Sequence, residues 1–92
     1  MGESAVYVGV DVSKHQLDYA LSDREEAFTV PNTEAGVRDL VDALREASPA
    51  LVVMEATGGF EVPAAGALAA AEIPVVVANP RQVRDGPVRF SV

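Results

Sequence analysis

The sequence predicts an α/β domain built on a mixed sheet, with the element order β-β-β-α-β-α-β. Short apolar runs separated by turn residues fill the first third, as in an antiparallel meander. Farther on, apolar residues recur at spacings of three and four, which is typical of a helix packed on one face. Two apolar runs, 5–10 and 50–54, each end on an acid. Ligands of open α/β sheets usually bind at such carboxyl ends of strands.

The first strand is expected over Ala5–Asp11, and the rest of the fold is arranged around it. Its apolar, mostly β-branched residues are of the kind buried on both faces of a sheet. Gly9 removes a side chain, which would let a neighbouring element approach closely. Asp11 then follows at the carboxyl end, where it either meets a cation or forms a turn.

The remaining elements follow in chain order. A tight turn leads to strands over 16–22 and 27–30, the second ended by Pro31. Asn32 or Thr33 supplies the N-cap of a helix that Pro49 stops. Its apolar face consists of four residues: Val37, Leu40, Val41 and Leu44. The chain continues with a strand over 50–54 ending on Glu55, a glycine turn at 57–59, an Ala-rich helix over 60–71 and a strand over 73–78.

The composition indicates one small domain over residues 1–92. Hydrophobic residues make up 49% of the chain, which is enough for a core. There is no Cys, so disulfides and thiolate metal sites are excluded and a cytoplasmic protein is expected. No signal peptide is evident, and no run approaches the roughly 20 apolar residues of a membrane span.

The charge balance is acidic, with 14 Asp and Glu against 7 Lys and Arg. A net charge of −7 opposes strong non-specific binding to nucleic acid. Contacts to a phosphate backbone are therefore expected only locally, from Arg81 and Arg84, one helical turn apart, and from Lys14. Ordinary solvated surface charge is the alternative for all three.

Asp11 and Glu55 are the candidate chemical groups. If the first and fourth strands are parallel neighbours, as a right-handed crossover through the first helix allows, the two acids emerge side by side. Mg²⁺ commonly binds one or two carboxylates together with waters and phosphates. Two such ions can activate a nucleophile and stabilise the leaving oxygen of a phosphodiester. The alternative is that both acids serve only as turn formers or caps.

Four segments in this order resemble the motifs of one family: Gly9–Lys14, Val30–Thr33, Met54–Phe60 and Asn79–Asp85. They are similar to the N-terminal domain of DEDD-type insertion-sequence transposases of the IS-one-ten kind, over about residues 8–85. The resemblance implies a RuvC-like, RNase H-like fold, in agreement with the element order. It also implies that Asp11 and Glu55 are the first two catalytic acids and Mg²⁺ ligands for DNA strand cleavage or transfer. DNA is the implied partner, and a guide RNA stays open.

The sequence departs from that family after Asp85. The family's last two acids, an Asp-x-x-Asp pattern on a helix, and its later serine-bearing domain have no match here. Gly86 and Pro87 interrupt the helix expected at this point, and residues 86–92 diverge. We therefore expect a truncated catalytic fragment, incomplete at its C-terminus, that binds Mg²⁺ weakly or not at all and does not cleave DNA alone.

Two other functions stay open. An actin- or sugar-kinase-like nucleotide-binding domain would share the fold, but the turn over 12–14 is bulkier than a phosphate-binding turn. A non-catalytic interaction module would bury an under-covered sheet face against a second copy, so a homo-oligomer is expected. Among the minor candidates, Ser13 and His15 are expected in the first turn. The glycine turn either presents N–H groups to a phosphate or is a structural turn with Thr57 as cap.

Overall fold

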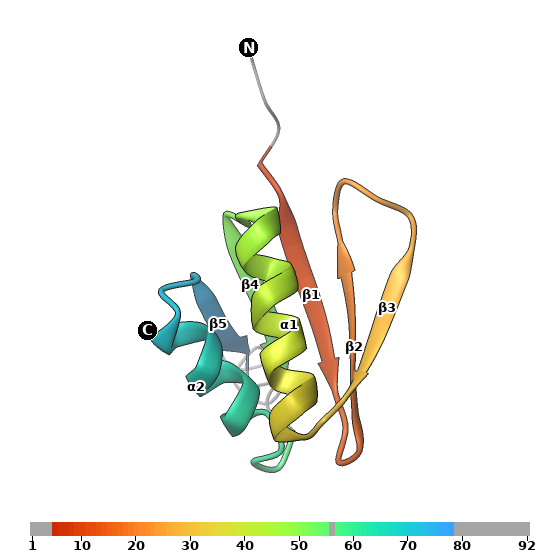
Figure 1. Cartoon of the computed structure of the whole chain (residues 1–92), viewed down its shortest axis with the longest axis vertical. Coiled ribbons are helices and arrows are strands. Elements are labelled where there is room, and N and C mark those ends of the chain that lie inside the picture. Colours follow the sequence, from red (N-terminus) through yellow and green to blue (C-terminus); the bar gives the residue numbers. More distant parts are fainter. Residues whose placement is uncertain (1–4, 56, 79–92) are drawn as a thin grey trace, which may run out of the picture.

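The computed structural model describes residues 5–55 and 57–78. Its five strands form one mixed sheet in the order β3-β2-β1-β4-β5 (Figure 1). In chain order the elements are β1 (Tyr7–Val12), β2 (Gln16–Leu21), β3 (Ala27–Pro31), α1 (Glu34–Ala47), β4 (Leu51–Glu55), α2 (Val62–Ala70) and β5 (Val75–Ala78). The predicted element order is confirmed, with boundaries shifted by one or two residues. No helix in the described part of the chain is long and apolar enough to span a membrane.

The strand directions follow from the connections. β1, β2 and β3 are joined by short turns and pair antiparallel, as a meander must. α1 carries the chain back across the sheet, and β4 then pairs parallel with β1. α2 makes the second crossover, which places β5 parallel to β4 at the edge. The first and fourth strands are therefore parallel neighbours, as expected from the sequence.

Both helices cover the same face of the sheet (Figure 1), and this corrects the prediction for β1. Val8, Val10 and Val12 are buried beneath the helices, whereas the intervening residues of β1 are exposed. Tyr7 is 51% exposed. The apolar run is therefore buried on one face only, because no described element covers the other. We call the uncovered side the open face; it carries Tyr7, Gly9, Asp11, Val53 and Glu55.

The close approach expected at Gly9 is not found among the described residues. A Cβ atom built at Gly9 would meet none of their atoms within 4 Å. The close approach occurs at Gly36 in the first turn of α1, where a Cβ would lie 1.8 Å from the carbonyl oxygen of Pro31. The junction between β3 and α1 therefore requires a glycine at position 36.

α1 begins and ends through local hydrogen bonds. Thr33 is the N-cap, and its hydroxyl accepts a hydrogen bond from the Gly36 N–H at 3.1 Å. The helix ends at Ala47, two residues before Pro49, because Ser48 adopts a left-handed conformation (φ 50°) and its N–H donates to Leu44 O. The four predicted apolar residues of this helix are all buried.

α2 begins two residues later than expected, since residues 57–61 close a turn first. Pro63 lies in its first turn, as predicted, where a missing N–H is tolerated. Only Ala64 and Leu68 of this helix are fully buried.

Candidate active site on the open face

Asp11 and Glu55 lie next to one another at the carboxyl ends of β1 and β4. The parallel register pairs Val10 with Met54, and the two acids are the next residues along. Paired strands run about 4.8 Å apart, and residues in register point to the same side of a sheet. Both acids are exposed on the open face, and both line one hollow of about 490 Å³ with Gly9 and Val53. The structure thus brings together the two acids singled out in the sequence.

Asp18 on β2 is a third acid at this hollow, and the sequence reasoning missed it. It is the direct cross-strand partner of Asp11 and lines the same hollow. The Thr29 hydroxyl donates to Asp18 Oδ1 at 2.6 Å, and Gln16 Nε2 donates to both carboxylate oxygens at 3.1 Å. The bond from Thr29, followed by those from Gln16, lowers the pKa of Asp18 below its ordinary value. The sequence contained one indication of this acid, because Asp18 lies on the polar face of the alternating second strand.

The donor set fits a divalent cation bound through two carboxylates. Mg²⁺ accepts one or two protein carboxylates and fills its other positions with water or phosphate oxygens. Asp11 and Glu55 supply that number from neighbouring strands. No cluster of three or more acidic, His or Cys residues close enough to hold a metal ion exists within residues 5–55 and 57–78. Asp18, bonded to Thr29 and Gln16, therefore does not complete a three-ligand set.

The turn after β1 is closed by Ser13. Its hydroxyl donates to Gln16 O at 3.0 Å and accepts from the Gln16 N–H at 3.2 Å. Its own N–H donates to Gln16 O at 2.9 Å. Ser13 is therefore a turn former, as expected. Lys14 and His15 are exposed in the same turn.

The glycine turn after β4 is a structural turn. The N–H groups of Thr57 and Gly59 donate to the Glu61 carboxylate at 2.8 and 3.1 Å. Those groups are therefore not free for a phosphate. The Thr57 N–H, the largest contributor, lowers the pKa of Glu61 below its ordinary value. Gly58 and Gly59 both adopt positive φ, which glycine permits. Thr57 is not the cap that was predicted, because its hydroxyl donates to Glu55 O. The N-cap residue of α2 is Glu61.

Arg81 and Arg84, the other predicted nucleic-acid contacts, lie outside the described residues, as does Asp85.

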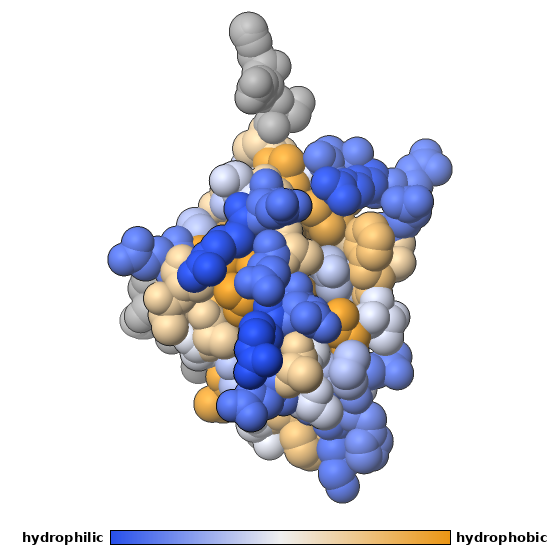
Figure 2. All heavy atoms as spheres, viewed as in Figure 1, coloured by the Kyte–Doolittle hydropathy of each residue, from blue (hydrophilic) through white to orange (hydrophobic). Residues whose placement is uncertain are grey.

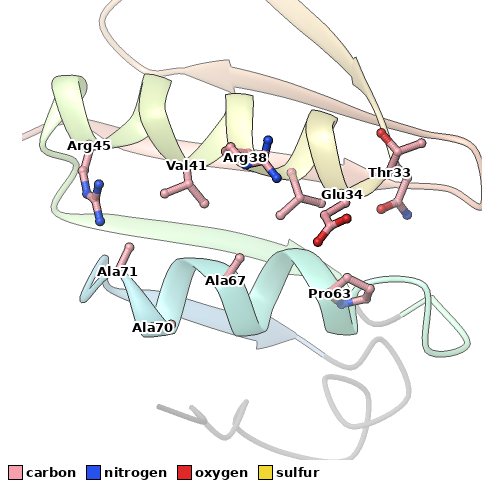
Figure 3. A pocket seen from close by; sticks show the side chains of 11 residues that line it. Thr33, Glu34, Arg38, Val41, Arg45, Pro63, Ala67, Ala70 and Ala71 are labelled. Atoms are coloured by element: carbon pink, nitrogen blue, oxygen red, sulfur yellow. The ribbon is translucent and has the colours of Figure 1, made fainter.

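A larger hollow of about 630 Å³ lies on the opposite side of the molecule, between α1 and α2 (Figure 3). Val41, Ala67 and Ala71 form part of its apolar lining, and Arg38 and Arg45 approach it from α1. Figure 2 shows hydrophilic side chains gathered along α1 and more apolar ones over α2. Glu34 is the single carboxylate among its lining residues, so the paired acids of a metal site are not found here.

The comparisons with known proteins agree with the fold described above. The family model described as "Transposase", for the DEDD type of the IS110 (IS-one-ten) kind, matches residues 8–89. The chain also resembles RuvC of T. thermophilus in complex with a Holliday junction substrate. That likeness has a TM-score of 0.63 and 15% identity, and covers 89% of this chain and 69% of that chain. A second Thermus thermophilus RuvC structure gives a TM-score of 0.61 and 18% identity, with 86% and 64% covered. No curated protein sequence matched.

At these identities the likeness to RuvC concerns the fold alone. The predicted RuvC-like, RNase H-like fold is confirmed by both structures. The chain spans about two thirds of the length of the two RuvC chains.

Proposed function

The chain belongs to the DEDD transposase family of the IS110 kind, and on that premise we propose that its open face is part of an Mg²⁺-dependent site for DNA strand cleavage or transfer. The observation that carries this proposal is the adjacency of Asp11 and Glu55, one residue beyond the last pair of the β1–β4 ladder. Two exposed carboxylates on neighbouring strands match the oxygen ligands that Mg²⁺ prefers.

The residues of the open face have separate parts in this proposal. Asp11 and Glu55 would bind the cation, which would supply polarisation of a phosphodiester and a lowered pKa for a nucleophilic water or hydroxyl. Asp18 stays ionised through Thr29 and Gln16, so it adds a fixed negative charge beside Asp11. That charge attracts the cation and opposes a DNA phosphate until the cation is bound. Lys14, exposed in the turn beyond Asp11, would contact the phosphate backbone, together with Arg81 and Arg84.

We propose that the 92-residue chain does not cleave DNA alone. Only two of the family's four acids have matches in the sequence, and fewer charged ligands bind a cation more weakly and order it less. Turnover on DNA with Mg²⁺ or Mn²⁺ that disappears in Asp11→Ala would contradict this proposal.

Other proposed partners are less specific. An oligomer of this chain is supported by Tyr7 and Val53, which are 51% and 38% exposed on the open face. A guide RNA is proposed from the family resemblance alone.

A nucleotide-binding function finds no support, because the turn after β1 is closed by Ser13 and the glycine turn by Glu61.

Cation binding is tested by thermal unfolding at increasing MgCl₂ or MnCl₂. A cation at ten times its Kd adds about 1.4 kcal/mol of stability, which raises Tm by about 6–11 °C in a domain of this size. Because two acids alone are expected to bind the cation weakly, we expect this increase only at high cation concentration, in the wild type and not in Asp11→Asn or Glu55→Gln. Asp39→Asn removes one charge from an exposed position of α1 and is the matched control. The proposal fails if the wild type shows no increase, or if both site variants keep it.

A further inference from the structure

Asn32 connects the two loops that follow the acid-bearing strands. It lies between β3 and α1, directly before the N-cap, and is partly buried. Its side-chain Nδ2 donates to the carbonyl oxygen of Ser13 at 2.9 Å and to that of Phe60 at 3.2 Å. An amide NH₂ group has two hydrogens, so one side chain makes both bonds. The Asn32 backbone N–H donates separately to His15 O at 2.9 Å.

These two carbonyl groups are close to the acids along the chain. Ser13 is two residues after Asp11 in the turn that follows β1. On the other side, hydrogen bonds hold residues 57–60 and link Thr57 to Glu55. The Thr57 hydroxyl donates to Glu55 O at 2.9 Å, and the Phe60 N–H donates to Thr57 O at 3.1 Å. A continuous series of hydrogen bonds therefore runs from Glu55 through Phe60 and Asn32 to Ser13.

This series lies beyond the last described pair of β1 and β4, which is Val10 with Met54. Asp11 and Glu55 follow that pair, so no pairing described between β1 and β4 includes them. Beyond the acids, the Asn32 side chain is a described connection between the loops that follow the two strands. Ligand residues keep their geometry only when surrounding hydrogen bonds orient them.

We propose that Asn32 is a positioning residue, which fixes the distance between Asp11 and Glu55 by linking the loops that follow them. The inference rests on the proposed cation site, because positioning matters there only if the two acids share an ion. The described hydrogen bonds of Asn32 go to neither acid, so its effect passes through the backbone of the two loops.

The test compares Asn32→Asp and Asn32→Ala with the wild type. Asp has nearly the shape of Asn but offers no donor to the two carbonyl groups, and Ala removes the side chain. In both variants the backbone bond to His15 is retained. Ser22→Ala is the control, because it removes a side-chain hydrogen bond at the other end of β1, in which the Ser22 hydroxyl accepts from the Tyr7 N–H at 2.9 Å.

Two measurements use the metal-free 92-residue chain. Amide hydrogen exchange in the two loops, at residues 13–16 and 57–62, should become about 30-fold faster in both Asn32 variants, since two hydrogen bonds are lost. Nuclear Overhauser contacts between Asp11 and Glu55 should weaken in the Asn32 variants and persist in Ser22→Ala. A third measurement titrates the wild type and the Asn32 variants with Mn²⁺ at a temperature well below Tm. The loss of the two Asn32 hydrogen bonds should raise the Kd for Mn²⁺ by about 10-fold or more.

The outcomes are distinct. Faster exchange in both loops, weaker contacts between the acids and a raised Kd support the inference. Faster exchange in one loop only, or unchanged contacts between the acids, overturns it, as does an unchanged Kd when the wild type binds Mn²⁺. If the wild type binds no Mn²⁺, the proposed function fails, and the two metal-free measurements still decide whether Asn32 positions the acids.

Discussion

Gly36→Ala should destabilise the protein, although alanine is the better helix former. The Cβ added at Gly36 would lie 1.8 Å from the Pro31 carbonyl oxygen and 2.8 Å from its carbon, whereas real Cβ contacts essentially never fall below 3.0 Å. The obstacle is backbone and cannot rotate away. Pro31 is paired with Gln16 in the sheet, and α1 is fixed by its buried residues Leu40 and Leu44. The junction between β3 and α1 must therefore open.

The expected loss follows from two opposing terms. Overpacking of this kind costs about 1–3 kcal/mol or more, and Gly→Ala in a helix returns about 1 kcal/mol. A backbone contact of 1.8 Å calls for the upper end of the overpacking cost, so the net loss is about 2 kcal/mol, which lowers Tm by about 8–16 °C in a domain of this size. Gly66→Ala in α2 is the matched control. Its Cβ would meet no described atom within 4 Å, so Tm should rise by about 2–8 °C.

Urea unfolding followed by circular dichroism measures both variants against the wild type. Equal m-values would show that the differences lie in stability and not in the unfolded state. If Gly36→Ala is as stable as the wild type, the close packing of α1 on the end of β3 is wrong. If Gly66→Ala loses as much stability as Gly36→Ala, the loss is a general property of these helices and not of the contact with Pro31.

Two further predictions concern the loop after β4 and the open face. The Thr57 and Gly59 N–H groups lower the pKa of Glu61, so the ionised carboxylate stabilises the folded state. This stabilisation should be fully present above the ordinary pKa of 4.5 and should disappear as pH falls through the lowered value. Glu61→Gln should therefore be less stable than the wild type at pH 7, with the gap closing in urea titrations at lower pH, and a gap that is constant with pH would contradict this. Light scattering at micromolar concentration should report a dimer or larger oligomer, and a monomer would count against the proposal that a second copy buries Tyr7 and Val53.

Local patterns were enough to predict the helices and the order of the elements along the chain. The spacing of Val37, Leu40, Val41 and Leu44 defines one helical face and needs no tertiary information. The adjacency of Asp11 and Glu55 was predictable because handedness restricts how α1 returns the chain to the sheet. Their proposed role as Mg²⁺ ligands stays a prediction.

Other features depend on contacts between distant residues and were not predictable. The one-sided burial of β1 was hidden because its open-face residue Tyr7 is itself bulky and largely apolar. Gly36 was not recognised, since its contact with Pro31 arises only when α1 turns back from β3. The bonds of Asp18 to Thr29, and of Asn32 to Ser13 and Phe60, require the strand register and the packing of three loops. Single positions in a sequence carry no such information.

The order of the strands affects how the acid pair responds to local opening. β1 is bordered by β2 and β4, and β4 by β1 and β5, so each acid is carried by an interior strand. Fraying usually starts at the margins of a sheet, here β3 and β5, each of which has a single partner among the described strands. Such partial opening leaves the β1–β4 ladder intact, so the two strands that carry Asp11 and Glu55 should stay paired until the whole domain unfolds.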